Sequence, residues 1–414
     1  MKNLFLAALA GIGAAFSIQA ADGDTFTYEG LIYNVLSEAD KTCEVGLHDY
    51  KNADLAKGAV VIPPKVIYNG EEYTVTALGY KAFYGNGGMT SLSIPETVTL
   101  IKESSISQTM KLFELRLPNS VTEVEPRGIY GNWSLQTLRL STGMRVINRE
   151  ACNANPALGA VVIPEGVETV CDDAFNYCSR ATRIVFGSTV SSIGKMSFAG
   201  LQALPKVSIP ANVKELGEQA FSYCPKLAEV TLEASTQPLA FNKEVFGEGK
   251  YAGQLNDDSW ARIETLNLNR NWTCTSTEAA HQPFYNKTTL KTINLGSNVT
   301  QIPVNSFAGC DNIMAVNITG TMCPVIATSA FSDKVYSSAT LTVPENMVLL
   351  YKSHSVWGRF QKIEGSNESG ITDIEADENA PVEYFNLQGI RVATPENGLY
   401  IRRQGSKVTK VLVK

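Results

Sequence analysis

The sequence predicts a solenoid of short repeated turns, and two regularities of its 414 residues support this prediction. Strand-like runs end in apolar anchor residues that recur every 23 residues: Ile94, Leu117, Leu140, Ile163, Phe186, Ile209 and Leu232. Twelve residues after the anchors comes a second apolar column: Ile106, Ile129, Cys152, Phe175, Phe198 and Phe221, with Phe83 one step earlier. One turn cannot bury its apolar residues alone. The turns are therefore expected to stack, each adding one short strand about 4.8 Å from the next in a parallel β-ladder.

The period lengthens after Leu232. The next anchors are Leu268, Leu295, Ile318 and Val343, at steps of 36, 27, 23 and 25 residues. The first of these steps has 13 more residues than the usual 23, and its Gly-rich and polar stretch at 247–260 indicates a long loop. The phenylalanine column is predicted to resume at Phe284, Phe307 and Phe331.

The N-terminus has the pattern of a signal peptide over residues 1–20. Lys2 precedes an apolar run at 4–16, which is too short to span a bilayer, and Ala20 supplies a small residue before the expected cleavage site. The alternative is a buried N-terminal helix. No other apolar stretch is long enough to predict a transmembrane segment in the mature chain.

The remaining sequence divides into four parts. Residues 21–80 predict a β-rich N-terminal cap and the entry to the first repeat, with strands at 26–36 and 60–75 and a hairpin turn at Asn69-Gly70. Residues 81–364 form the predicted solenoid and its C-terminal cap, in which 346–352 is expected to be helical. A linker at 365–370 and a small β module at 371–414 follow.

Composition and motifs argue against several classes of function. The net charge is −6 and Lys and Arg form no block, so neither a nucleic-acid partner nor a polybasic membrane patch is predicted. The three histidines, His48, His281 and His354, are too far apart in sequence for a helical zinc motif. No nucleophile elbow or phosphate loop is present. We therefore expect no catalytic site, no metal and no cofactor.

Carboxylates and cysteines have simple interpretations in this repeat. Asp172-Asp173 is expected on a solvated edge, and Asp257-Asp258 in the long loop leaves calcium as an alternative. Cys178 and Cys224 each follow a column phenylalanine by three residues, where a small buried side chain is expected. The two cysteines are two turns apart, which is about 9.6 Å and beyond the reach of a disulfide. We predict that they are not bonded.

Two groups of residues are candidates for binding. Arg116 and Arg139 occupy the same outward strand position on consecutive turns, and Arg183 is expected near Lys206. Stacked arginines can bind carboxylates or sulfates, although an ordinary solvated strand face is the alternative.

The second candidate group is in the long loop. Tyr251 and Trp260 could anchor a protein or a sugar, unless the loop folds back and buries Trp260. Asn267, Asn294 and Asn317 share one outward column further along, where an asparagine ladder of structural role is the alternative to a binding surface.

The units resemble a known repeat family. Ile209-Pro210, Val213, Leu216-Gly217, Ala220-Phe221 and Cys224 together give the pattern of the BspA-type leucine-rich repeat of bacterial surface proteins. The resemblance covers about 60–364 and is weaker at Ile106, Ile129 and Cys152 and in the 36-residue unit. It implies a leucine-rich-repeat solenoid and an exported, adhesin-like protein that binds host matrix proteins or other bacteria.

The tail resembles the short C-terminal modules of exported proteins from Gram-negative gut and oral bacteria, and carries Tyr384-Phe385 and Gly398-Leu399-Tyr400. Some such modules sort or anchor the chain, whereas others only cap or space it.

The sequence therefore predicts an exported, non-catalytic protein, either secreted or at the cell surface in association with the outer membrane. Its expected partner is a host or bacterial surface protein. Glycan binding and an enzymatic function are the alternatives.

Overall fold

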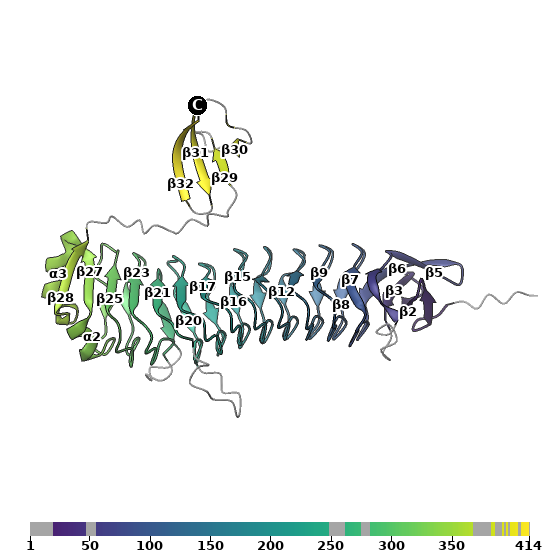
Figure 1. Ribbon diagram of the computed structural model, residues 1–414, viewed down its shortest axis with the longest axis horizontal. Helices are drawn as coiled ribbons and strands as arrows, with labels where there is room; N and C mark the ends of the chain where they lie inside the picture. Colours follow the sequence, from purple (N-terminus) through teal and green to yellow (C-terminus); the bar gives the residue numbers. More distant parts are fainter. Residues whose placement is uncertain are drawn as a thin grey trace, which may run out of the picture.

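The computed structural model describes residues 20–46, 55–247, 261–274, 282–366, 382–385, 391–392, 395, 398–404 and 407–413. The chain is an elongated leucine-rich-repeat type solenoid of about 12 turns (Figure 1). The predicted stacking of 23-residue turns is confirmed. The prediction of one strand per turn is wrong, because most turns contribute a strand to each of two parallel ladders.

The first ladder contains the strands predicted from the anchor residues. It comprises β4 (Gly58–Val61), β7 (Met89–Ser93), β9 (Glu114–Arg116), β11 (Thr137–Arg139), β13 (Val161–Val162), β15 (Ile184–Val185), β17 (Lys206–Ile209), β19 (Glu229–Leu232), β21 (Thr265–Leu268), β23 (Thr292–Leu295), β25 (Ala315–Ile318), β27 (Thr340–Pro344) and β28 (Lys362–Ser366). Its hydrogen-bonded segments are β4–β7–β9–β11, β13–β15 and β17 to β28. Leu232 pairs with Leu268 and Leu268 with Leu295, so the insertions leave the register intact.

The second ladder follows seven residues after the anchors. It comprises β6 (Glu71–Leu78), β8 (Leu100–Ile101), β10 (Glu123–Val124), β12 (Val146–Ile147), β14 (Thr169–Val170), β16 (Ser192–Ile193), β18 (Glu215–Leu216), β20 (Leu239–Phe241), β22 (Trp272–Cys274), β24 (Gln301–Ile302) and β26 (Val325–Ile326). Most of these strands have only two residues, which is too short for the alternation that identifies a strand in a sequence.

Stacked phenylalanine rings form the centre of the core. The ring centroids of Phe198 lie 5.8 Å from Phe175 and 5.4 Å from Phe221. Phe246 continues the column between Phe221 and Phe284, at 5.8 and 6.0 Å. The 23-residue period does not predict Phe246, because two extra residues after Leu232 move it out of register.

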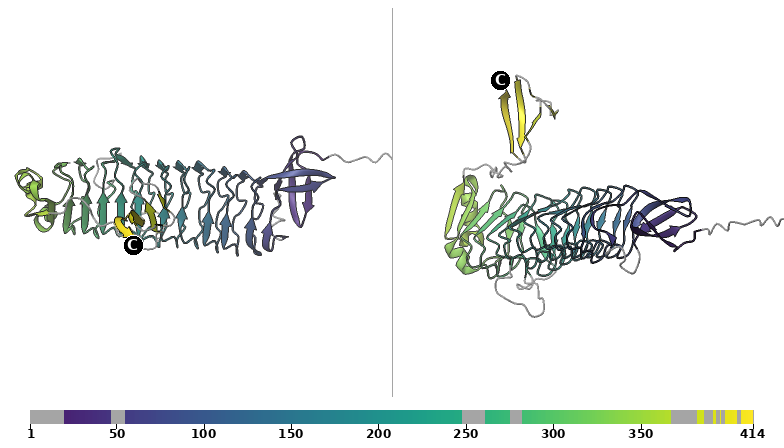
Figure 2. Two further views of the ribbon diagram at one scale, coloured as in Figure 1. Left: turned by 90° about the horizontal axis from the view of Figure 1, so that it is seen from above. Right: turned by 45° about the vertical axis from the view of Figure 1, so that its right-hand side comes forward.

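A small β-sheet closes the N-terminal end (purple in Figures 1 and 2). It adds β1 (Thr25–Tyr28), β2 (Leu31–Ser37), β3 (Thr42–Val45) and β5 (Lys65–Tyr68), and β3 pairs with β6 of the second ladder. The predicted single strand at 26–36 is a hairpin, since Glu29 and Gly30 turn the chain with φ of 45° and 81°. The hairpin at Asn69-Gly70 is confirmed, with φ of 51° and 83°.

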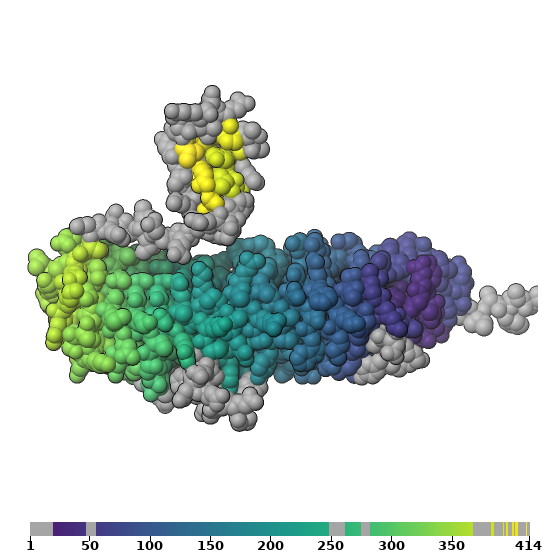
Figure 3. Space-filling view, viewed as in Figure 1, coloured from purple at the N-terminus to yellow at the C-terminus, as the bar shows by residue number. Residues whose placement is uncertain are grey.

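Short helices and β28 close the other end. They are α2 (Asp333–Ser338), the 3₁₀ helix η3 (Glu345–Met347), α3 (Val348–Ser353) and the 3₁₀ helix η4 (Trp357–Arg359). The buried Trp357 indole Nε1 donates to the Pro324 carbonyl at 2.9 Å. β28 includes Gly365 and Ser366, which the sequence analysis assigned to the linker. Between the two ends the turns pack into one continuous body (Figure 3).

The C-terminal strands form a separate antiparallel sheet. β29 (Val382–Phe385), β30 (Arg391–Val392), β31 (Gly398–Gln404) and β32 (Lys407–Val413) pair in the order β30-β29-β31-β32. Among the described residues, no helix has both the length and the apolarity to cross a membrane.

Candidate functional site

The outward side of the first ladder, which we call the strand face, is hollowed over its N-terminal half. The hollow has a volume of about 1310 Å³ and extends from β7 to β15. Arg116, Arg139 and Arg183 line it together with Glu96 and Glu114. Three of the predicted binding residues thus lie in one depression.

The arginines differ in their partners. Arg116 lies beside Arg139 in the register of β9 and β11, as predicted. The Arg116 guanidinium is 3.6 Å from the Glu114 carboxylate, in an exposed pair that contributes little to stability. Arg139 and Arg183 form no ion pair with any described side chain. Positive charge on this face is therefore only partly neutralised.

Lys206 is not in the hollow. It begins β17, where it pairs in register with Glu229 of β19. The ladder is interrupted between β15 and β17, so no strand pairing joins Arg183 to Lys206. The proximity of these two residues therefore stays a prediction.

Apolar side chains complete the strand face. Val162 and Val185 follow Arg139 in the same outward column and are 41% and 45% exposed. Arginine is among the residues enriched at protein–protein interfaces, and the two valines add exposed apolar surface beside it. The geometry suits binding of a macromolecule better than enclosure of a small substrate.

An apolar patch at the rim was not found by the sequence analysis. Met110, Phe113 and Trp133 are 52%, 51% and 63% exposed. The Phe113 carbonyl accepts from the Gln136 backbone at 2.9 Å, and Gln136 lines the hollow. The sequence signal that could have revealed this patch is Phe113, an aromatic residue at the position that Gln136 and Gly159 occupy in the next two turns.

The asparagine ladder is self-contained. Asn317 Nδ2 donates to Asn294 Oδ1 at 2.8 Å, and Asn294 Nδ2 donates to Asn267 Oδ1 at 2.7 Å. Asn267 Nδ2 then donates to Glu229 Oε1 at 2.9 Å. These amides bind one another along the sheet, which favours the structural interpretation.

Several other candidates can now be placed. Tyr251, Trp260 and Asp257-Asp258 lie outside the described residues. Among the residues that are described, no three His, Cys, Asp or Glu side chains gather in a way that could hold a metal. No disulfide joins Cys178 and Cys224, which confirms that prediction. Burial raises the pKa of both thiols to about 12.

Family comparison agrees with this architecture. The BspA type leucine rich repeat region matches in six copies over residues 76–180, 145–249 and 260–354. These ranges cover well over half of the chain, so the protein belongs to the BspA-type leucine-rich repeat family. No curated protein matches it at a significant level.

Solved structures of bacterial repeat proteins are similar. A leucine-rich repeat protein from Bacteroides ovatus shares 18% identity at a TM-score of 0.39, over 82% of this chain and 99% of the other. A leucine rich cell surface protein from Faecalibacterium prausnitzii shares 20% at 0.41, over 83% and 95%. The pneumococcal vaccine antigen PcpA shares 16% at 0.38, over 84% and 100%.

Proposed function

We propose that this chain is an exported, non-catalytic protein that binds another protein through the strand face. The observation that carries the proposal is the hollow lined by Arg116, Arg139 and Arg183, in which two guanidinium groups have no described ion-pair partner. Carboxylates on a partner would bind such groups in bidentate pairs. Val162 and Val185 would add apolar contact beside them.

The expected partner is a protein of the host or of another bacterium. The signal-peptide pattern at 1–20 supports export, and the resemblance to adhesin-like repeat proteins supports a place at the cell surface or in secretion. The separate sheet of β29 to β32 then serves as a sorting, anchoring or spacing module.

Charge reversal on the strand face tests the proposal. The purified chain is presented to separate panels of host matrix proteins and bacterial surface proteins, beside the Arg116→Glu/Arg139→Glu variant. An Arg145→Glu/Arg149→Glu variant is the control, because these arginines are exposed near the second ladder and have partners outside the hollow. Binding that is lost only in the first variant supports the proposal. Binding that survives in it moves the site away from the strand face.

A further inference from the structure

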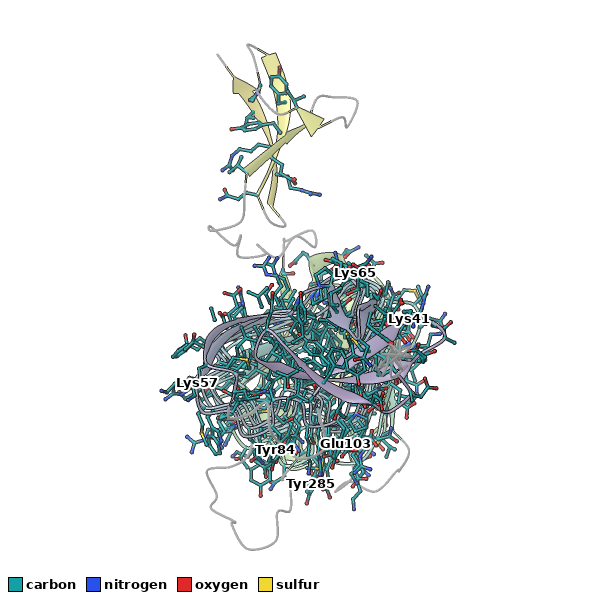
Figure 4. The ribbon with its side chains drawn as sticks, turned by 90° about the vertical axis from the view of Figure 1, so that its right-hand side faces the viewer. Lys41, Lys57, Lys65, Tyr84, Glu103 and Tyr285 are labelled. Carbon is teal, nitrogen blue, oxygen red and sulfur yellow. The ribbon has the colours of Figure 1, made fainter. Side chains whose placement is uncertain are left out.

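A row of tyrosines follows the phenylalanine column along one edge of the solenoid. Each lies one or two residues after the column residue of its turn: Tyr84, Tyr130, Tyr177, Tyr223 and Tyr285. Their column residues are Phe83, Ile129, Phe175, Phe221 and Phe284, which belong to every second turn. The first and last of the tyrosines project on the same side of the molecule, although they are many turns apart (Figure 4).

Around Tyr177 the intervening turns carry short side chains two residues after the column residue, Ala154 in the turn before and Gly200 in the turn after, whereas the turn between Tyr84 and Tyr130 carries Gln108 there. The Tyr177 ring lies against the next turn, because a Cβ added to Gly200 would be 3.1 Å from its Cδ1. Tyr177 and Tyr285 are both 38% exposed. The edge around Tyr177 therefore presents an exposed aromatic ring between the short side chains of Ala154 and Gly200.

Backbone hydrogen bonds fix the spacing of this edge. Tyr177 N donates to Ala199 O at 2.9 Å, and Gly200 N donates to Ser222 O at 2.8 Å. Turns joined in this way are spaced like strands in a sheet, so alternate turns are roughly 10 Å apart. The rings of Phe175, Phe198 and Phe221 beneath them, at 5.8 and 5.4 Å, show a similar rise.

We propose that this tyrosine row binds an extended flat-ribbon polysaccharide, of the cellulose or chitin type, with one tyrosine against every second sugar ring. In such a ribbon successive sugars are turned over, so the same ring face recurs once per disaccharide. The length of that unit agrees with the distance between alternate turns. A tyrosine offers an apolar ring to the C–H face of the sugar and a hydroxyl to its polar edge.

A polypeptide ligand fits this row less well. An extended strand presents side chains on one face about every 6.7 Å, which does not match the spacing of the tyrosines. The site is also distinct from the strand face, because the row follows the column residues rather than the anchors. The two binding activities should therefore be separable by mutation.

Moving one tyrosine of the row by one turn tests whether sugar binding depends on the spacing of the tyrosines. The Ala154→Tyr/Tyr177→Ala variant keeps the number of tyrosines and exchanges two residues with nearly equal left-handed backbones, at φ of 56° and 61°. Isothermal titration of the full chain with cello- and chito-hexasaccharides should show binding that weakens for the disaccharides. The exchange should weaken hexasaccharide binding roughly tenfold or more, since one ring contact is lost and a ring now stands in place of the short Ala154 side chain.

Three controls keep the test decisive. Tyr177→Ala/Tyr223→Ala should also lose binding, whereas Trp133→Ala, which removes an exposed aromatic outside the row, should retain it. The Arg116→Glu/Arg139→Glu variant should bind the sugars normally, so failure of the strand-face proposal leaves this one standing. The proposal is overturned if the chain binds neither sugar series. It is also overturned if a folded Ala154→Tyr/Tyr177→Ala variant binds the sugars unchanged, or if Trp133→Ala loses sugar binding.

Discussion

Single buried side chains tie several turns to the one before. In these turns, the residue three positions after the column residue donates to the carbonyl of the preceding column residue. Asn155 Nδ2 donates to Ile129 O at 2.9 Å, and Cys224 Sγ donates to Phe198 O at 3.6 Å. Where the long insertion separates two turns, Lys287 Nζ reaches Phe246 O at 2.6 Å across 41 residues. Chemically different residues therefore perform one structural task.

Asn132 should be among the most sensitive of these positions. Its Nδ2 donates to Ile106 O at 2.9 Å, and its Oδ1 accepts from the Thr109 backbone and hydroxyl at 3.0 and 2.7 Å. Asn132→Ala would leave these buried groups unpaired and should lower the free energy of unfolding by about 2–4 kcal/mol. Urea denaturation measures the loss. Cys224→Ala, which removes only a weak thiol donor, should cost less, and the reverse order would contradict the argument.

The buried thiols should make stability sensitive to alkaline pH. Burial raises the pKa of Cys178 and Cys224 from 9.0 to about 12. In the unfolded chain they ionise near 9.0, so the folded state favours the protonated thiol. Their contribution to stability is complete below pH 9 and is lost as the pH rises towards 12, at up to about 1.4 kcal/mol per pH unit for each thiol.

Unfolding midpoints measured between pH 8 and 11 test this dependence. Cys224→Ala should be less stable than the parent at pH 8 and should lose stability more slowly above pH 9. The other titrating groups are common to both chains and cancel in the comparison. A constant difference between the two chains across the range would show that the thiol does not titrate as we expect.

At the scale of one element, the second ladder depends on close contact between neighbouring turns. Gly217 follows β18 and packs on Gly194, which follows β16. A Cβ on Gly217 would lie 2.4 Å from the Gly194 carbonyl carbon, a distance that requires the backbone to move. Gly217→Ala should therefore destabilise the protein by about 1–3 kcal/mol. Thermal denaturation measures the loss. Gly87→Ala is the control and should be nearly neutral, because a Cβ at Gly87 would have no neighbour within 4 Å.

The elements differ in how well the sequence predicted them. Strands of the first ladder have anchors and alternation, so even β21 and β23 were placed correctly across insertions. The two-residue strands of the second ladder were not predicted, because they are too short to show the alternation of a strand. The turn at Glu29-Gly30 was not predicted from the sequence. The positive φ of Glu29, which makes the turn possible, is seen only in the structure.

At the scale of the whole molecule, the sequence predicted which residues point outward better than which of them form a site. Arg116 and Arg139 were placed correctly because one register relates them. Lys206 begins β17 and does not line the hollow, an outcome that no residue pattern in the sequence predicts. The tyrosine row is present in the sequence, but it has twice the repeat period and lies away from the strands that carry the predicted arginine site.

A solenoid in which each turn contacts only its neighbours should respond locally to damage. Phe198 stacks between Phe175 and Phe221 and meets Phe186 edge-on at 5.5 Å. Phe198→Ala should cost about 3–5 kcal/mol through lost burial and the cavity that remains. In hydrogen exchange followed by mass spectrometry, amides of the turns next to Phe198 should lose protection, while residues 20–46 and 340–366 keep theirs.

The matched control for this experiment is Val185→Ala. Val185 belongs to the same turn but is 45% exposed on the strand face, so its loss should change stability by less than about 0.5 kcal/mol. Equal loss of protection along the whole chain of the Phe198→Ala variant would mean that the array unfolds as one cooperative unit. Local loss would mean that a partner bound to the strand face can be retained while a distant turn opens, because the turns transmit disorder only to their neighbours.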